Sequence, residues 1–355
     1  MASPSTEHVL AAHSAGLTYV TDADPGIRRR GAGRGFAYYA PDGTLIANRA
    51  TLRRLKDLTI PPGWTDVWIC PDPLGHIQVT ARDIKGRKQY RYHARYRALR
   101  DESKFGRMLQ FSDALPELRV RIERDLSRPG LTRKKVMAAI VRLLDKTLIR
   151  VGNDEYARQN RSYGLTTLRS RHVSVSGSQL KFEFRGKSGI QHSVSITDRR
   201  LARIVQQCQD LPGQDLFQYL DRDGNRQTVT SGDINAYLRD STHTAVTAKD
   251  FRTWAGSMLA AKALRDLGPA TSEREAKRNV NRAIDAVASR LGNTRAVCRK
   301  YYVHPVIIDA YLRGSLAPPP PAAPGGQEKR ARLSAALRRD EANVLQFLQE
   351  EIGRD

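Results

Sequence analysis

Residues 291–305 read Leu-Gly-Asn-Thr-Arg-Ala-Val-Cys-Arg-Lys-Tyr-Tyr-Val-His-Pro, with two adjacent tyrosines near the end. Three basic residues precede this stretch in widely separated segments, namely Arg150, Lys187 and Arg252. A phenol is a weak nucleophile at neutral pH. Its attack on a phosphate therefore needs cations that stabilise charge on the oxygens and a proton source for the leaving group. The order arginine, lysine, arginine, asparagine, tyrosine supplies such a set.

These segments resemble the catalytic pentad of type IB DNA topoisomerases, particularly the compact poxvirus-like branch that also occurs in bacteria. The resemblance spans roughly residues 16 to 315. It implies relaxation of supercoiled DNA by transient single-strand cleavage through a 3′-phosphotyrosyl intermediate and religation, without ATP, metal or another cofactor. The catalytic residues that it implies are Arg150, Lys187, Arg252, Asn293 and Tyr302.

The two arginines are expected to clamp the non-bridging oxygens of the scissile phosphate. Guanidinium groups suit this role because they stay charged and bind two oxygens in one plane. Arg150 is expected to end an apolar helix, where the structural alternative is a solvated charge that stabilises the helix dipole. For Arg252 the structural alternative is a salt bridge with Asp250.

Lys187 lies in the run Phe-Arg-Gly-Lys-Ser-Gly, which predicts the tip of a β-hairpin. By resemblance it is the general acid that protonates the departing 5′-oxygen. Burial beside two arginines would ease that proton donation. The structural alternative is a solvated turn lysine.

Asn293 stands where the viral enzymes usually have histidine. Its amide can donate a hydrogen bond to phosphate but cannot transfer a proton. Gly292 is expected to stop a helix directly before it. Tyr302 follows Asn293 by the interval that the family uses. Tyr301 is its competitor, and since neighbouring side chains of a helix point about 100° apart, only one of the two can attack. We expect Tyr302.

The charge of the chain indicates a polyanionic partner. The 355 residues include 60 lysines and arginines against 37 aspartates and glutamates, a formal charge of +23. The basic residues are interleaved with aromatic ones, which favours a folded nucleic-acid-binding protein over a membrane-surface protein or a disordered basic tail. By resemblance the partner is double-stranded DNA, bound by a monomer.

Compartment and metal content are inferred from three absences. Cys70, Cys208 and Cys298 have no metal-ligand spacing. No apolar stretch approaches the ~20 residues of a transmembrane helix, and the N-terminus lacks a signal-peptide pattern. We therefore expect a soluble protein of a reducing compartment, cytoplasmic and associated with the nucleoid, with no metal site.

The periodicity of the sequence predicts an α+β fold. Short strand-like runs such as Ile77–Ala81, broken by turns, predict a β-rich N-terminal domain. Farther on, apolar residues recur at helical spacing, and three alternating runs predict a β insertion in a mainly helical catalytic domain. By resemblance the two domains form a clamp around DNA. A proline-rich linker is expected to hold a last helix apart from the catalytic fold. The expected organisation is a flexible leader over residues 1–15, a β-rich DNA-binding domain over 16–104, the catalytic domain over 105–315, the linker over 316–327 and a C-terminal helical extension over 328–355.

Residues 86–92 read Gly-Arg-Lys-Gln-Tyr-Arg-Tyr and resemble the segment with which the viral enzymes enter the major groove. Basic side chains there can hold phosphates, while glutamine and tyrosine can touch base edges. The structural alternative is a solvated β face. The expected DNA contacts are Arg87, Lys88, Gln89, Tyr90 and Tyr92, together with Tyr156, which would hold a phosphate near the cleavage site.

Two other functions stay open. Tyrosine recombinases use the same phosphotyrosine chemistry, but they typically carry His-x-x-Arg where this chain has Lys249-Asp250-Phe251-Arg252. That difference and the β-rich first domain favour a topoisomerase. The non-enzymatic alternative is a basic architectural DNA-binding protein.

Overall fold

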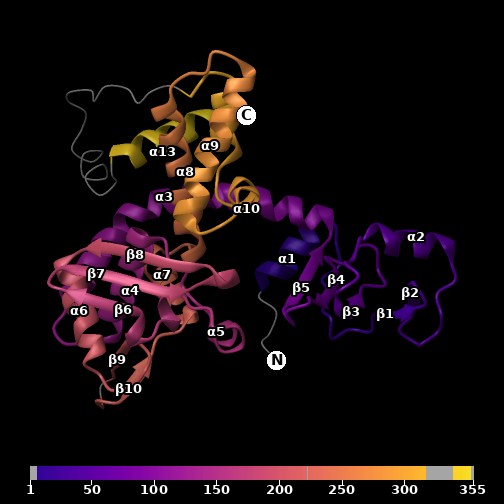
Figure 1. Cartoon of the computed structure of the whole chain (residues 1–355), viewed down its shortest axis with the longest axis horizontal. Helices are drawn as coiled ribbons and strands as arrows, with labels where there is room; N and C mark the ends of the chain where they lie inside the picture. Colours follow the sequence, from indigo (N-terminus) through magenta and orange to yellow (C-terminus); the bar gives the residue numbers. More distant parts are fainter. Residues whose placement is uncertain (1–5, 222, 317–338, 353–355) are drawn as a thin grey trace. The chain divides into compact units, whose positions relative to one another are not determined.

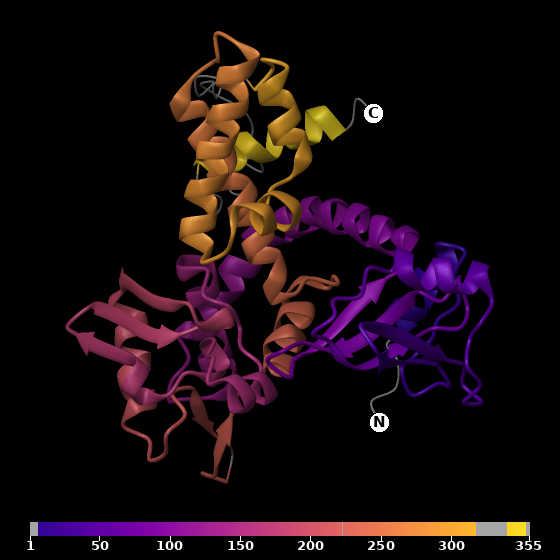
Figure 2. The same ribbon diagram turned by 45° about the vertical axis from the view of Figure 1, so that its right-hand side comes forward.

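The computed structural model describes residues 6–221, 223–316 and 339–352 of the chain. The chain divides into two compact units, Met1–Lys104 and Phe105–Asp355, and each is described by itself (Figures 1 and 2). The first unit holds a five-stranded sheet, and the second holds helices and a three-stranded sheet. The expected α+β class is therefore confirmed.

The first unit is built on an antiparallel sheet. Its elements are α1 (Thr6–Ser14), β1 (Ile27–Ala32), β2 (Gly35–Tyr39), α2 (Arg49–Asp57), β3 (Thr65–Ile69), β4 (Ile77–Arg82) and β5 (Lys88–Tyr92), after which α3 (Ala94–Leu126) begins. The strand order is β2-β1-β3-β4-β5, so β5 is an edge strand. The core packs Ile69 and Val79 of the sheet together with Leu55 of α2. Asn48 starts α2, and its Oδ1 accepts a hydrogen bond from the backbone N–H of Thr51 at 3.0 Å.

The second unit packs its helices around one apolar core. Beyond the end of α3 they are α4 (Arg133–Thr147), α5 (Asp154–Asn160), α6 (Arg199–Gln209), α7 (Ser231–Thr242), α8 (Ala248–Leu267), α9 (Glu273–Leu291), α10 (Arg295–Tyr301), α11 (Pro305–Leu312) and α13 (Arg339–Ile352). Val136 and Ile140 of α4 and Val280 and Ile284 of α9 are all buried, which is why the helical spacing of apolar residues forms helices here. α8 and α9 lie side by side.

The β insertion is a meander of three antiparallel strands, as the sequence predicted. The strands are β6 (Val173–Ser176), β7 (Gln179–Arg185) and β8 (Gln191–Thr197), with β7 in the middle (Figure 1). Leu180, Phe182 and Phe184 of β7 are buried while the residues between them are exposed, so one face of this sheet covers the core. A short 3-10 turn, η3 (Lys187–Gly189), joins β7 to β8.

The C-terminal helix packs on the catalytic unit. α13 contacts α8 and α11, and its residues Val344 and Leu348 are buried in the common core. Its Glu341 carboxylate accepts a hydrogen bond from Arg119 Nη1 at 2.7 Å, and the same guanidinium donates to Asp145 at 3.0 Å. The expectation that the last helix stands apart from the catalytic fold is therefore wrong. The proline-rich linker and the expected first part of this helix, residues 317–338, lie outside the described residues.

Candidate active site

The connection that follows α4 carries Arg150. α4 ends at Thr147, and Leu148 turns the backbone into the left-handed region with a φ of 60°. The carbonyl of Arg150 accepts a hydrogen bond from the backbone N–H of Leu165 at 2.8 Å. Gly164 approaches so closely that an added Cβ would lie 2.6 Å from that oxygen. The expectation that Arg150 ends the helix is wrong. The helix ends at Thr147, and the backbone hydrogen bond from Leu165 holds Arg150 beyond that end.

Arg252 lies in the first part of α8 and is only 5% exposed. Its Nη1 donates to the carbonyl of Leu148, and its Nη2 donates to the carbonyl of Leu291 at 2.7 Å. The carboxylate of Asp250 accepts instead from the backbone N–H and the hydroxyl of Thr247, at 2.7 and 2.9 Å. Arg252 thus ties the ends of α4 and α9 to the start of α8. Its Nε is buried without a hydrogen-bond partner among the described residues.

The turn between α9 and α10 carries Asn293. Gly292 ends α9 with a φ of 57°, as the sequence predicted. The Oδ1 of Asn293 accepts a hydrogen bond from Arg150 Nη2 at 2.7 Å. Its Nδ2 is buried and has no hydrogen-bond partner in the part of the chain that the structure describes. The arginine therefore orients the amide so that its donor group is left for a ligand.

Tyr302 follows the last residue of α10 and faces α8. The Cζ of Arg252 lies 5.2 Å from the centroid of its ring. Gly256 of α8 makes this approach possible, because a Cβ added there would lie 2.9 Å from the Cβ of Tyr302. Tyr301 is 39% exposed, and Lys300 Nζ lies 5.5 Å from its ring centroid. The two tyrosines have different surroundings, and Tyr302 is the one beside the arginine.

The charges around Tyr302 change the pKa of its hydroxyl. Burial raises this pKa, but the charges of Arg252 and Arg150, a hydrogen bond with Arg252 and the charge of Lys187 outweigh burial and lower it below its ordinary value. The pKa of Arg252 is itself lowered, first by burial and then by the charge of Arg150. The phenolate form of Tyr302 is thus favoured relative to a free tyrosine, as activation of a phenol requires.

Lys187 lies in η3, at the tip of the β7–β8 hairpin, as expected. The residue is exposed, so the burial expected for this lysine is absent from the structure. Its charge still acts on the Tyr302 hydroxyl. The hairpin tip and the two arginines therefore belong to one electrostatic site.

His192 of β8 is a part of this site that the sequence reasoning missed. Its ring stacks on the ring of Phe184, with centroids 5.1 Å apart. Burial and the charges of Arg150 and Arg252 lower the pKa of its imidazole. The signal in the sequence was the alternation along β8, which puts a histidine on the less exposed face of the strand. Nothing in that pattern brings the two arginines to it.

Two family models match the chain. The model described as eukaryotic DNA topoisomerase I, catalytic core, matches residues 93–313. The model described as bacterial DNA topoisomerase IB, N-terminal domain, matches residues 35–83. The chain belongs to the type IB DNA topoisomerases.

Individual relatives agree with this assignment. The DNA topoisomerase 1B of Acanthamoeba polyphaga mimivirus is 33% identical over 294 residues, which cover 81% of this chain and 87% of the relative. The DNA topoisomerase 1B of vaccinia virus (strain Copenhagen) is 22% identical over 146 residues, 40% of this chain and 46% of the relative. The enzyme is thus an isomerase that relaxes DNA by cleavage and religation, and the recombinase and architectural alternatives are set aside.

In this topoisomerase the expected DNA contacts of the first unit lie on or directly before edge strand β5. Tyr90 and Tyr92 share one face of the strand, and their rings stack with centroids 6.1 Å apart. Tyr90 is 46% exposed. Lys88 lies on the same face, where its Nζ forms an ion pair with Asp22 at 2.5 Å and lies 5.5 Å from the Tyr90 ring centroid. This face offers aromatic surface beside a cation.

Arg87 and Gln89 share one acidic partner. Arg87 Nη2 pairs with the carboxylate of Asp83 at 2.6 Å, and Gln89 Nε2 donates to the same carboxylate at 2.8 Å. Hydrogen bonding from Arg87 is the main reason that the pKa of Asp83 falls to about 2. Of the five expected contacts, Lys88, Tyr90 and Tyr92 therefore share one face of β5. The other two, Arg87 and Gln89, are held by Asp83.

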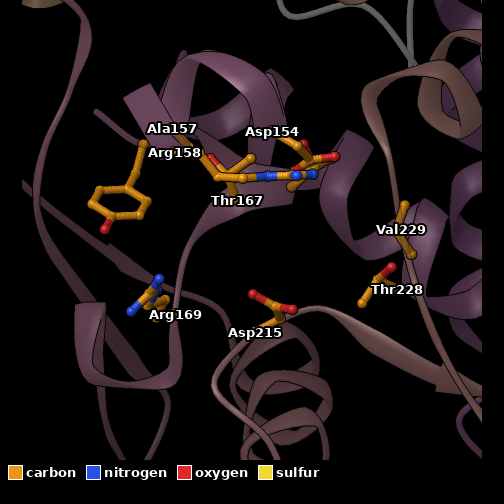
Figure 3. A pocket seen from close by; sticks show the side chains of 10 residues that line it. Asp154, Ala157, Arg158, Thr167, Arg169, Asp215, Thr228 and Val229 are labelled. Carbon is orange, nitrogen blue, oxygen red and sulfur yellow. The ribbon is translucent and has the colours of Figure 1, made fainter. Parts of the chain in front are cut away.

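Tyr156 lies in α5 of the second unit. A cavity of about 370 Å³ opens beside this helix (Figure 3). Arg158 and Arg169 line it together with Asp154 and Asp215. None of the five expected catalytic residues lines this cavity. Because its lining mixes both signs of charge, the cavity does not by itself mark a phosphate site.

The described residues hold neither a membrane-spanning helix nor a metal-ligand cluster. No helix in this part of the chain is long and apolar enough to cross a bilayer. Likewise, no group of three or more histidines, cysteines, aspartates and glutamates is arranged there to hold a metal ion.

Proposed function

We propose that Tyr302 attacks the scissile phosphodiester, forming a 3′-phosphotyrosyl bond and releasing a 5′-hydroxyl. One observation carries this proposal. The Tyr302 phenol lies against the Arg252 guanidinium, in a field that lowers the pKa of its hydroxyl. The donors Asn293 Nδ2 and Arg252 Nε, which find no hydrogen-bond partner within the described residues, are buried in the same site. A phosphate is the kind of ligand that such donors need.

The two arginines and Asn293 stabilise charge on the non-bridging oxygens. Arg150 already hydrogen-bonds Asn293, and Arg252 is anchored to two carbonyls, so both guanidiniums are oriented before DNA binds. Donors fixed in advance are the main source of stabilisation in reactions of this kind. Loss of one costs about 10²- to 10³-fold in rate.

Lys187 protonates the 5′-oxygen as it departs. Its position on a hairpin tip allows it to enter a groove of the DNA, and the bound duplex would supply the burial that the free protein lacks. The energy of the broken bond is kept in the tyrosyl phosphate. Attack by the 5′-hydroxyl therefore reseals the strand without ATP, and the roles assigned to these side chains require no metal.

Each of the two units contacts duplex DNA, and the enzyme acts as a monomer. The first unit offers the tyrosine face of β5 to the major groove, and Tyr156 holds a backbone phosphate. The formal charge of +23 supports contact with a long stretch of phosphates. We place its action in the cytoplasm, on DNA of the nucleoid.

Relaxation of plasmid DNA in EDTA without ATP tests this mechanism. The enzyme should relax both negative and positive supercoils under these conditions. A cleavage substrate labelled on the 5′ side of the break should transfer its label to the protein, because the phosphate stays on the 3′ end. A requirement for a divalent metal or ATP, or transfer of label from the other side of the break, would contradict the proposal.

A further inference from the structure

The imidazole of His192 lies between the two turns that carry Lys187 and Asn293. We propose that His192 is a positioning residue. Its flat ring acts as a spacer that sets the position of the hairpin carrying Lys187 relative to the turn carrying Asn293. This inference rests on the proposed roles of those two residues. It concerns a side chain outside the pentad of arginine, lysine, arginine, asparagine and tyrosine.

The first contact of the ring is with Gly186, the residue directly before Lys187. A Cβ added to Gly186 would lie 2.5 Å from Cδ2 and 2.6 Å from Nε2 of His192. The backbone of Gly186 has a φ of −95° and a ψ of −166°, a conformation open to any residue. Glycine is therefore needed there because of the imidazole, not because of the backbone.

The second contact is with Gly292, the residue directly before Asn293. A Cβ added to Gly292 would lie 2.6 Å from Cε1 of His192. A third side of the ring stacks on Phe184, itself buried, with an interplanar angle of 13°. The imidazole thus fills the space between a strand, a hairpin tip and a helix end, and its contacts lie one residue from each of two proposed site residues.

The electrostatic surroundings favour a neutral ring. Burial, followed by the charges of Arg150 and Arg252, lowers the pKa of the imidazole. A cation in the field of two guanidiniums would cost free energy, whereas a neutral ring packs without that cost. His192 therefore contributes to the site through the flat shape of its ring and not through a charge.

Single-turnover cleavage by His192→Ala and His192→Phe tests this role. His192→Ala should slow cleavage by up to about 100-fold, the loss that a misplacement of about 1 Å can cause. His192→Phe keeps a flat ring and should restore most of the rate. Gln191→Ala, which changes the exposed neighbour on β8, is the matched control and should cleave like the parent enzyme. Cleavage at the parent rate by His192→Ala, or equal loss in the alanine and phenylalanine variants, would overturn the proposal.

A substrate with sulfur at the bridging 5′ position separates positioning of Lys187 from a general defect. Sulfur leaves with little need for a proton, so it should restore cleavage by Lys187→Ala. It should also restore that part of the loss in His192→Ala that comes from a displaced Lys187. Arg252→Ala should stay slow. If sulfur restores Lys187→Ala but not His192→Ala, the spacer role fails and the general acid stands. If it restores neither, the general-acid role fails, and the double variant Gly186→Ala/His192→Ala decides the spacer role alone.

The Gly186 contact gives a test that does not depend on the lysine chemistry. Gly186→Ala should slow cleavage, because its methyl group strikes the imidazole. In Gly186→Ala/His192→Ala the struck ring is gone, so the double variant should be no slower than His192→Ala alone. Thermal melting confirms that each variant is folded. Losses that multiply in the double variant would show that the two residues act separately and would overturn the proposal.

Discussion

Arg252 both holds helix ends together and belongs to the proposed catalytic site. Two of its nitrogens donate to the carbonyls of Leu148 and Leu291, while its Nε stays buried and unpaired in the described structure. A buried cation with incomplete partners is costly, and burial accordingly lowers its pKa. The positive charge of Arg252 is therefore incompletely neutralised, and the ligand proposed to neutralise it is a phosphodiester.

Arg252→Lys should slow cleavage by about 10² or more, even though the charge is kept. An ammonium group cannot bridge two carbonyls and also face a phosphate in a fixed plane. Single-turnover cleavage measures the effect, and Lys249→Arg, an exposed neighbour, is the control. A variant that cleaves at the parent rate would show that only charge is needed at this position.

The lowered pKa of His192 gives a pH dependence of stability with a defined sign. Below about pH 6.5 the unfolded chain binds a proton at this imidazole that the folded chain resists. The free energy of unfolding contributed by His192 is thus complete above that pH and is lost as the pH falls through the lowered folded-state pKa.

His192→Gln removes this dependence. Urea unfolding between pH 7.5 and 5 should show a steeper loss of stability for the parent than for the variant. Other histidines contribute equally to both proteins and cancel in the comparison. Parallel curves would mean that the imidazole is not held neutral by its surroundings.

Among the secondary-structure elements, the sequence patterns correctly predict the helices and strands that bury one face. The apolar spacing of α4 and α9 and the alternation of β7 each report burial of one face, so these elements follow from the sequence. Gly292 correctly predicts the end of α9, because a left-handed helix end strongly favours glycine. Helical periodicity wrongly predicts that the helix extends to Arg150, because it does not show where a left-handed Leu148 breaks the helix.

Close approaches between elements were not predictable from these patterns. The contact of His192 with two glycines and the packing of α13 on α8 both depend on segments that lie far apart in the sequence. The exposure of Lys187 at a hairpin tip likewise differs from the burial expected for it. The bonds that Arg252 makes to helix ends also replace the salt bridge that its neighbour Asp250 suggested.

Gly256 is an element-scale test of the site. In the interior of a helix, alanine is usually more stabilising than glycine by about 0.5–1 kcal/mol. Here the added methyl group would meet Tyr302 at 2.9 Å from its Cβ. Gly256→Ala should therefore impair adduct formation while α8 stays folded, as circular dichroism can check. An alanine variant with full activity would show that α10 moves freely relative to α8.

At the scale of the whole molecule, the C-terminal helix is a part of the catalytic fold. Glu341 of α13 accepts hydrogen bonds from Arg119 Nη1 at 2.7 Å and from Trp254 Nε1 at 3.3 Å. Trp254 lies in α8, the helix that carries Arg252. Loss of α13 should therefore also disturb the packing of α8, the helix that carries Arg252.

Glu341→Gln should lower the free energy of unfolding by about 3 kcal/mol, the lower end of the cost of breaking a buried ion pair, because Arg119 keeps Asp145. Truncation after Ser315 should cost more, since the burial of Val344 and Leu348 is lost as well. Urea unfolding of the three proteins gives the order. A truncated enzyme as stable as the parent would show that the last helix is independent of the catalytic fold.

Formation of a covalent adduct by Tyr302→Phe and Tyr301→Phe decides which of the two tyrosines is the nucleophile. Both substitutions remove one hydroxyl, and the partly exposed Tyr301 is the natural control for Tyr302. With a labelled cleavage substrate, Tyr302→Phe should bind DNA without forming any adduct, and Tyr301→Phe should form a normal adduct. An adduct that survives in Tyr302→Phe and disappears in Tyr301→Phe would contradict it.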